Sequence, residues 1–245
     1  MKKFTTLCIF AGLILLLSAC ITFEGRNSIR TVQGTGNMTT TDFTTAHFTG
    51  IDIAGEYIIV YSQSQTASVS ISMQENLFNY LNVTVENGIL RVYSERSFRT
   101  DRNHTPRIYV SAPYFNTVTL AGATSAENWD TVTTDVLYID ISGVTDGVIP
   151  MQVNALEISA AGVADFTLTG TAHTANISIA GAGKIDAQAL QTADTTVAIA
   201  GGGSVDVAVS YTLDVTIAGA GTVRYVGDPQ VSRSIAGVGT VRQMD

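Results

Sequence analysis

The chain has 245 residues, of which 45% are hydrophobic and 14% are charged, and its formal net charge is −8. This length and apolar content are enough for one sizeable core. The acidic balance argues against a nucleic-acid partner, because a phosphate backbone attracts Lys and Arg. The low charge content, 22 glycines and abundant Thr, Val, Ile and Ala favour an all-β protein over a helical bundle.

Residues 1–19 have the pattern of a secretory signal peptide. Lys2 and Lys3 precede an apolar run over residues 7–17, which is shorter than the roughly 20 residues of a membrane-spanning helix. The run closes with Leu-Ser-Ala-Cys at residues 17–20, which resembles the lipobox of bacterial lipoproteins. The resemblance implies cleavage before Cys20 and attachment of lipid to that residue, which would anchor the protein in a membrane. The alternative is an ordinary cleaved signal followed by an incidental cysteine.

The residue after the cysteine is Ile21 and not the aspartate that typically retains lipoproteins in the inner membrane of enteric bacteria. In a cell with two membranes, this favours the outer one. Residues 20–45 are polar and are expected to form a flexible tether behind the lipidated cysteine. A single domain is expected over residues 46–245.

Within that domain, two local features stand out before the repeats begin. Asn87-Gly88 lies between two alternating runs and predicts a β-hairpin, because both residues tolerate a positive φ. Residues 94–106 are dense in charge and are expected to form a long exposed loop.

A phrase of the form Ile-x-Ile-Ala-Gly recurs in the C-terminal quarter of the chain. Taking the first glycine of each phrase as a marker, the clearest markers are Gly181, Gly201, Gly219 and Gly237. Weaker matches in steps of 18 to 21 residues extend the series back to Gly162, Gly143 and Gly122. A repeat of this length indicates a solenoid, in which each coil covers the apolar face of the next.

Apolar residues recur four before, two before and four after the markers. This alternation predicts inward-facing columns on two short strands per coil. Arg233 breaks a column in the last coil, where inward shielding is expected to fail. The glycines themselves are interpreted as corners, because glycine tolerates a positive φ and has no Cβ to collide with the adjacent coil. A phosphate-binding loop would need a following helix, and none is expected.

Several short motifs resemble the "head GIN" family of auto-transporter adhesin head domains. They are Phe48-x-x-Ile51-x-Ile53-x-Gly55, Asn87-Gly88-x-Leu90-x-Val92, Ile108-x-Val110-x-x-Pro113 and Gly122-Ala123. The resemblance covers about residues 46–242. It implies a right-handed parallel β-helix-like solenoid, in agreement with the repeat, whose steps predict about 18–21 residues per coil. The N-terminal part is expected to have hairpin-like strands. The resemblance also implies a secreted or lipid-anchored protein of a Gram-negative bacterium, and it brings no functional residues.

Carboxylates fall in two rows of the repeat. Asp146 and Asp165 lie three residues after consecutive markers, whereas Asp186 and Asp206 lie five residues after theirs and are followed in the same row by Arg224. The simpler interpretation of the second row is an exposed charge ladder in which Asp206 faces Arg224. The sharper one is a cation or sugar site around Asp186 and Asp206. All four aspartates are therefore tentative ligand-facing residues.

Trp129, the sole tryptophan, is the fifth such residue. It could stack on sugars from an exposed face of the solenoid, or it could cover the wider N-terminal half of the core. The histidines at positions 47, 104 and 173 lack metal-ligand spacing, and no Ser-His-Asp order or nucleophile elbow occurs. We therefore expect no metal, no cofactor and no catalytic residue.

The expected function is that of a lipid-anchored, non-catalytic binding, adhesion or structural module of the cell envelope. Its surface rows suit an extended ligand such as a polysaccharide, or another envelope protein. Two alternatives remain open. One is a polysaccharide-active, lyase-like or hydrolase-like β-helix enzyme, and the other is a periplasmic accessory component of a signalling or secretion system.

Overall fold

The computed structural model describes residues 31–100 and 103–244. The predicted signal peptide, Cys20 and the first part of the predicted tether lie outside these residues, as do Asp101 and Arg102 in the charged segment. The elements are β1 (Val32–Gln33), β2 (Met38–Phe43), β3 (Gly50–Gln63), β4 (Ser68–Gln74), the 3-10 helix η1 (Glu75–Tyr80), β5 (Leu81–Glu86), β6 (Ile89–Ser94), β7 (Phe98–Arg99), β8 (Arg107–Ala112), β9 (Thr117–Ala126), β10 (Val132–Gly201), β11 (Ser204–Gly219), β12 (Thr222–Val226), β13 (Gln230–Gly237) and β14 (Thr240–Gln243).

The all-β prediction is confirmed, and the two halves of the domain pair their strands differently. In the C-terminal half, all strand pairs are parallel. They begin with the pair of β3 and β9 and continue through β10 and β11 to β12, β13 and β14. Antiparallel pairs occur only in the N-terminal half of the described chain, where β4 joins β2 and β8, and β5 forms a hairpin with β6. The predicted turn at Asn87-Gly88 is present, with a positive φ at both residues.

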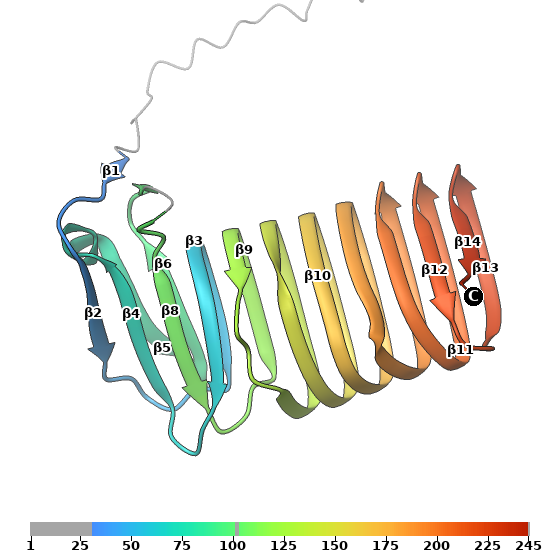
Figure 1. Ribbon diagram of the computed structural model, residues 1–245, viewed down its shortest axis with the longest axis horizontal. Coiled ribbons are helices and arrows are strands. Elements are labelled where there is room, and N and C mark those ends of the chain that lie inside the picture. Colours follow the sequence, from blue (N-terminus) through green and yellow to red (C-terminus); the bar gives the residue numbers. More distant parts are fainter. Residues whose placement is uncertain (1–30, 101–102, 245) are drawn as a thin grey trace, which may run out of the picture. The chain divides into compact units, whose positions relative to one another are not determined.

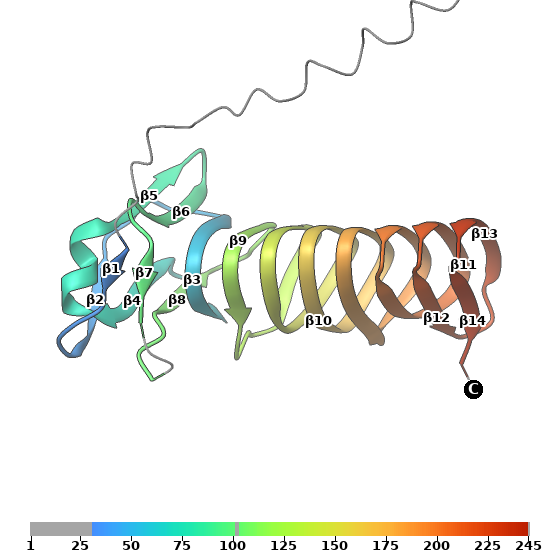
Figure 2. The same ribbon diagram turned by 90° about the horizontal axis from the view of Figure 1, so that it is seen from above.

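The long element β10 winds through successive coils that stack along one direction (Figures 1 and 2). Its coils meet at the glycine corners. A Cβ placed on Gly162, whose φ is +131°, would lie 2.3 Å from the carbonyl oxygen of Gly143. The amide that follows each of the later corners also donates to the carbonyl of the preceding corner, as Gly202 does to Gly181 at 2.9 Å. These contacts confirm the corner interpretation, because any side chain there would separate the coils.

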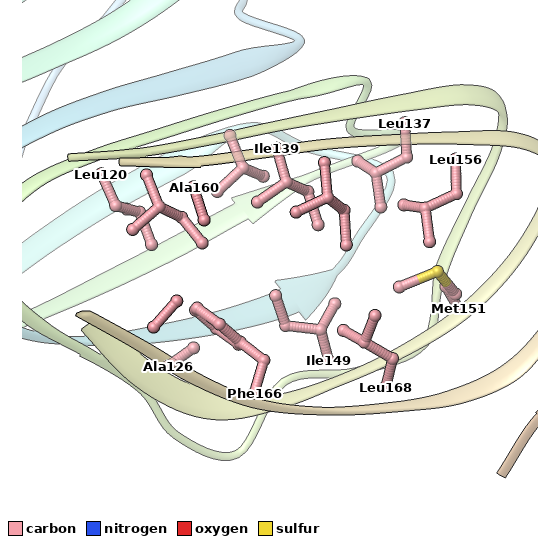
Figure 3. Packing of buried hydrophobic residues seen from close by; sticks show 14 of the residues in the cluster. Leu120, Ala126, Leu137, Ile139, Ile149, Met151, Leu156, Ala160, Phe166 and Leu168 are labelled. Atoms are coloured by element: carbon pink, nitrogen blue, oxygen red, sulfur yellow. The ribbon is translucent and has the colours of Figure 1, made fainter. Parts of the chain in front are cut away.

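The predicted inward columns form the core. Burial of each Val, Leu, Ile, Phe or Met side chain in these columns contributes about 1.5–3 kcal/mol. The columns therefore stabilise every coil against its neighbours. Figure 3 shows the two facing walls of this core, one carrying Leu120, Leu137, Ile139, Leu156 and Ala160, and the other carrying Ala126, Ile149, Met151, Phe166 and Leu168.

The β-structure begins earlier than the sequence suggested. Residues 38–43 were expected to belong to a tether, but they form β2, which pairs antiparallel with β4. Phe43 packs against the core and stacks on Phe78, with ring centroids 6.5 Å apart. Because β2 is an edge strand and its middle residues are exposed, its sequence is as polar as that of a linker. The expected loop over residues 94–106 likewise contains β7, which pairs with β1.

The last coil is open, as the position of Arg233 predicted. Arg233 pairs in register with Val215, and Ile235 with Ile217. Val215 and Ile217 are buried, whereas every residue of β13 is exposed. No further coil of the described chain covers these inward positions.

Candidate functional site

Residues on the strand that precedes each corner alternate between the core and the solvent. We call the solvent side the Tyr138 face; it consists of the residues one, three and five positions before the corner glycines of β9 to β13. The registers align these rows across coils: Tyr138 pairs with Thr117, Asp140 with Thr119, and Asp214 with Thr196 and Ser232.

A depression of about 240 Å³ lies on the Tyr138 face. It crosses several coils of β10, and its floor is low because the row three residues before the corners carries Ser159, Ser178 and Ala198. The residues that line it are Tyr138, Ile139, Asp140, Glu157, Ile158, Ser159, Asn176, Ile177, Ser178, Thr196 and Ala198.

Larger polar side chains also line this depression. Tyr138 is 49% exposed, so much of its aromatic surface is available. On the following coils, Asn176 Nδ2 donates a 2.6 Å hydrogen bond to Glu157 Oε1, which orients both groups. The carboxylate of Asp140 accepts no hydrogen bond from any residue that the structure describes. An aromatic surface beside orientated carboxylate and amide groups can bind a polar ligand that also has an apolar surface.

The residues that line the depression include two carboxylates and no basic side chain. The rows of the Tyr138 face from β9 to β13 add another carboxylate, Asp214, and again contain no Lys or Arg. Within the described residues, these carboxylates therefore have no cationic side chain in their own rows or in the lining of the depression.

The strand that follows each corner presents a second solvent side, which we call the Asp206 face; it consists of the residues one, three and five positions after the corner glycines. Its outermost row is a ladder, in which Asp186 pairs with Asp206, and Asp206 with Arg224. Arg224 Nε donates to Asp206 Oδ1 at 2.6 Å, and Arg224 Nη2 donates to Oδ2. These bonds and the charge of Asp206 raise the pKa of Arg224.

The Asp206–Arg224 ion pair was predicted, but the burial of Asp206 was not. Asp206 is only 2% exposed, because Arg224 lies on one side and the Gln188 amide, 3.4 Å from Oδ2, lies on the other. The prediction of an exposed ladder is therefore wrong for Asp206. A buried carboxylate requires a partner of this kind, and the pair accounts for Asp206 without a ligand.

The other aspartates proposed from the sequence remain on the Asp206 face and do not line the depression. Asp146 Oδ2 accepts a 3.0 Å hydrogen bond from the hydroxyl of Ser125. Asp186 Oδ1 accepts a hydrogen bond from the backbone N–H of Gln188 at 3.2 Å. Asp165 is exposed at the position equivalent to Asp146 on the next coil.

Trp129 belongs to the core, so the second of its two interpretations applies. It is 7% exposed, and its Nε1 donates to the carbonyl of Ile59 at 2.9 Å. Its ring packs against Tyr61 and Phe115, with centroids 5.6 and 6.4 Å away. A ligand on the surface would not reach this ring.

Across residues 31–100 and 103–244, no three His, Cys, Asp or Glu side chains are arranged to hold a metal ion. In the same part of the chain, no helix has both the length and the apolar character needed to cross a membrane.

Tyr138, Asp140, Glu157 and Asn176 are not among the residues predicted from the sequence. The predicted ligand-facing rows lie after the corners, whereas these side chains lie on the strand before each corner or border it. The same spacing, applied three and five residues before each marker, would have aligned these side chains on consecutive coils.

Family comparison agrees with this architecture. Residues 47–229 match the model of a family described as "Putative auto-transporter adhesin, head GIN domain". The chain belongs to this family. Head GIN members are described as adhesin-like, which suggests a protein of the cell surface or envelope. A comparison with curated protein sequences found no match.

Solved structures similar to this head GIN chain cover most of its length. A "putative adhesin" from Bacteroides fragilis NCTC 9343 is 26% identical, with a TM-score of 0.82 over 87% of this chain and 100% of that one. A "putative lipid binding protein" from Parabacteroides distasonis ATCC 8503 is 23% identical, with a TM-score of 0.70 over 88% and 100%. A "putative adhesin" from Parabacteroides merdae ATCC 43184 is 22% identical, with a TM-score of 0.58 over 87% and 99%. At these identities, the two Parabacteroides proteins show the fold alone.

Proposed function

We propose that this protein is a non-catalytic adhesion module of the cell envelope that binds an extended glycan along the Tyr138 face. The observation that carries the proposal is the depression that joins an exposed aromatic ring to carboxylate, amide and hydroxyl groups on neighbouring coils. Sugars offer both an apolar ring face and many hydroxyl groups, which match an aromatic surface and hydrogen-bonding side chains. Membership of an adhesin-like family supports a binding role.

The proposed architecture is a right-handed parallel β-helix of about 18–21 residues per coil. Adjacent coils of such a helix repeat about every 4.8 Å, a distance comparable to one pyranose unit of an extended chain. A polysaccharide that runs along the stack would thus meet equivalent positions on successive coils. The lipobox-like segment at residues 17–20 supports attachment through a lipid on Cys20, with the outer membrane as the proposed location.

Binding can be tested with the full chain on an array of bacterial-envelope and host glycans, followed by calorimetry with the ligands that bind. Tyr138→Ala is expected to weaken binding roughly two- to tenfold, because it removes the aromatic surface. Tyr211→Ala is the matched control, since Tyr211 is 69% exposed and does not line the depression. Absence of glycan binding above background, or equal losses in the two variants, would contradict the proposal.

One observation favours the rival enzymatic function. Asp140 and Glu157 line the same depression, and polysaccharide hydrolysis uses pairs of carboxyl groups. The same bound glycans should therefore be incubated with the protein and assayed for new reducing ends and unsaturated products. The adhesion proposal expects none, and products that disappear in Glu157→Gln would replace it with the enzymatic function.

A further inference from the structure

We infer that the depression on the Tyr138 face selects sugar units that carry a protonated amino group over N-acetylated, neutral or acidic units. The inference rests on the proposed glycan-binding function and names the ligand class of the same site. It is carried jointly by the exposed ring of Tyr138, the two unneutralised carboxylates and the hydrogen bond that orients one of them.

The carboxylates determine the preferred charge of the ligand. Asp140 and Glu157 line the depression without any Lys or Arg among the lining residues. A uronate or sulfated sugar would place like charges within a few ångströms of these groups, which is unfavourable. An ammonium group on the sugar would instead form charge-assisted hydrogen bonds with them.

The aromatic ring favours the same ligand. Tyr138 is on the coil of Asp140, two residues before it, and its row continues to Glu157 on the next coil. An aromatic face attracts both a cation and the apolar side of a sugar ring. A ring combined with carboxylates therefore suits an amino sugar, which presents both features in one unit.

Hydrogen bonding leaves acceptors free for this ligand. Asn176 donates to Oε1 of Glu157, so the carboxylate is held in place while Oε2 has no donor among the described residues. Asp140 likewise has both oxygens available within that part of the chain. The opposite arrangement exists at Asp206, where Arg224 already occupies both oxygens.

The test compares oligomers of glucosamine, N-acetylglucosamine and glucose of equal length, by calorimetry with the full chain at low salt and at a pH at which the amine is protonated. We expect the glucosamine oligomer to bind roughly four- to 25-fold more tightly than the other two, since each of two exposed ion pairs contributes about two- to fivefold. Added salt is expected to reduce this preference.

Two isosteric variants, Asp140→Asn and Glu157→Gln, provide the matched comparison. Each is expected to lower glucosamine-oligomer affinity by about two- to fivefold and to leave N-acetylglucosamine-oligomer affinity unchanged. Unchanged melting temperatures would confirm that both variants are folded. Oligolysine of the same charge serves as a sugar-free probe and is expected to bind more weakly than the glucosamine oligomer.

The outcomes separate the inference from the function on which it rests. Equal affinities for the amino and N-acetylated oligomers would overturn the inference and leave glycan binding intact. Oligolysine that binds as tightly as the glucosamine oligomer would overturn it too, because charge alone would then explain the selection. If no glycan binds, both the proposed function and the inference fail.

Discussion

Asp206 and Asp140, on the two solvent faces of the coils, differ in burial and in their partners. On the Asp206 face, a carboxylate is buried and both of its oxygens accept hydrogen bonds from Arg224. On the Tyr138 face, Asp140 is exposed and lies in a depression whose lining residues include no cation. The same backbone repeat therefore holds one carboxylate, Asp206, that is buried with a cation, and another, Asp140, that is exposed without one in the depression.

Burial explains this difference. Gln188 and Arg224 cover Asp206, and an ionised group removed from water is strongly unfavourable without a partner. Asp140 keeps its hydration, so the fold needs no counter-charge there. The search for ligand sites on a solenoid should therefore favour exposed carboxylates without partners over aligned rows of charge.

The largest expected effect disrupts both faces at once. In Gly162→Ala, the new Cβ would lie 2.3 Å from a backbone oxygen at a φ of +131°, so two adjacent coils must separate. We expect a loss of about 4 kcal/mol in the free energy of unfolding, measured by chemical denaturation. Gly202→Ala is the control, because the nearest atom to its new Cβ is 3.9 Å away. A similar loss in both variants would refute the corner interpretation.

A smaller effect isolates the Asp206 face. Arg224→Met removes the guanidinium and leaves the buried Asp206 carboxylate without its cation. We expect the melting temperature to fall by roughly 5–10 °C, as measured by circular dichroism. The double variant Arg224→Met, Asp206→Leu should recover part of this loss, because it removes the unpaired charge. No recovery would show that lost side-chain packing, and not the charge, causes the effect.

The smallest effect is expected on the Tyr138 face. Asp140→Ala removes an exposed carboxylate that makes no hydrogen bond within the described residues, so the melting temperature should change by no more than about 2 °C. A fall as large as that of Arg224→Met would mean that Asp140 stabilises the fold, and the contrast between the two faces would be lost.

The periodicity of the sequence was sufficient to predict the core of the coils. Val215 and Ile217 could be placed inside because alternation and an 18-residue step leave one arrangement. The corner glycines followed from the same step. The inward columns and the corners repeat in every coil, so the periodicity of the sequence predicts their positions.

Burial of Asp206 could not be predicted from that pattern. It depends on a register shift between Ala187 and Gln191, where the longer coil departs from the pairing. Gln188 lies in this irregular segment and reaches over Asp206. An irregularity of this kind interrupts the repeat, so extrapolating the repeat cannot place its side chains.

Edge strand β2 and the depression were missed for different reasons. An edge strand needs little apolar sequence, so Thr39 and its neighbours resembled a linker. The depression arises from the small size of Ser159, Ser178 and Ala198 relative to Tyr138. The depression depends on the relative sizes of outward side chains on neighbouring coils. The pattern of apolar and polar residues contains no information on these sizes.

The open last coil has a consequence for how copies of the molecule meet. In a stack of parallel coils, the unpaired strand edges of the last coil can pair with strands of another chain. Arg233 lies in the row that Val215 and its equivalents fill with apolar side chains, and β13 is exposed throughout. A charge in that row makes the terminal layer a poor template for another chain. A second chain stacked on this layer would bring an apolar side chain against Arg233, which is unfavourable for a charged group without a partner.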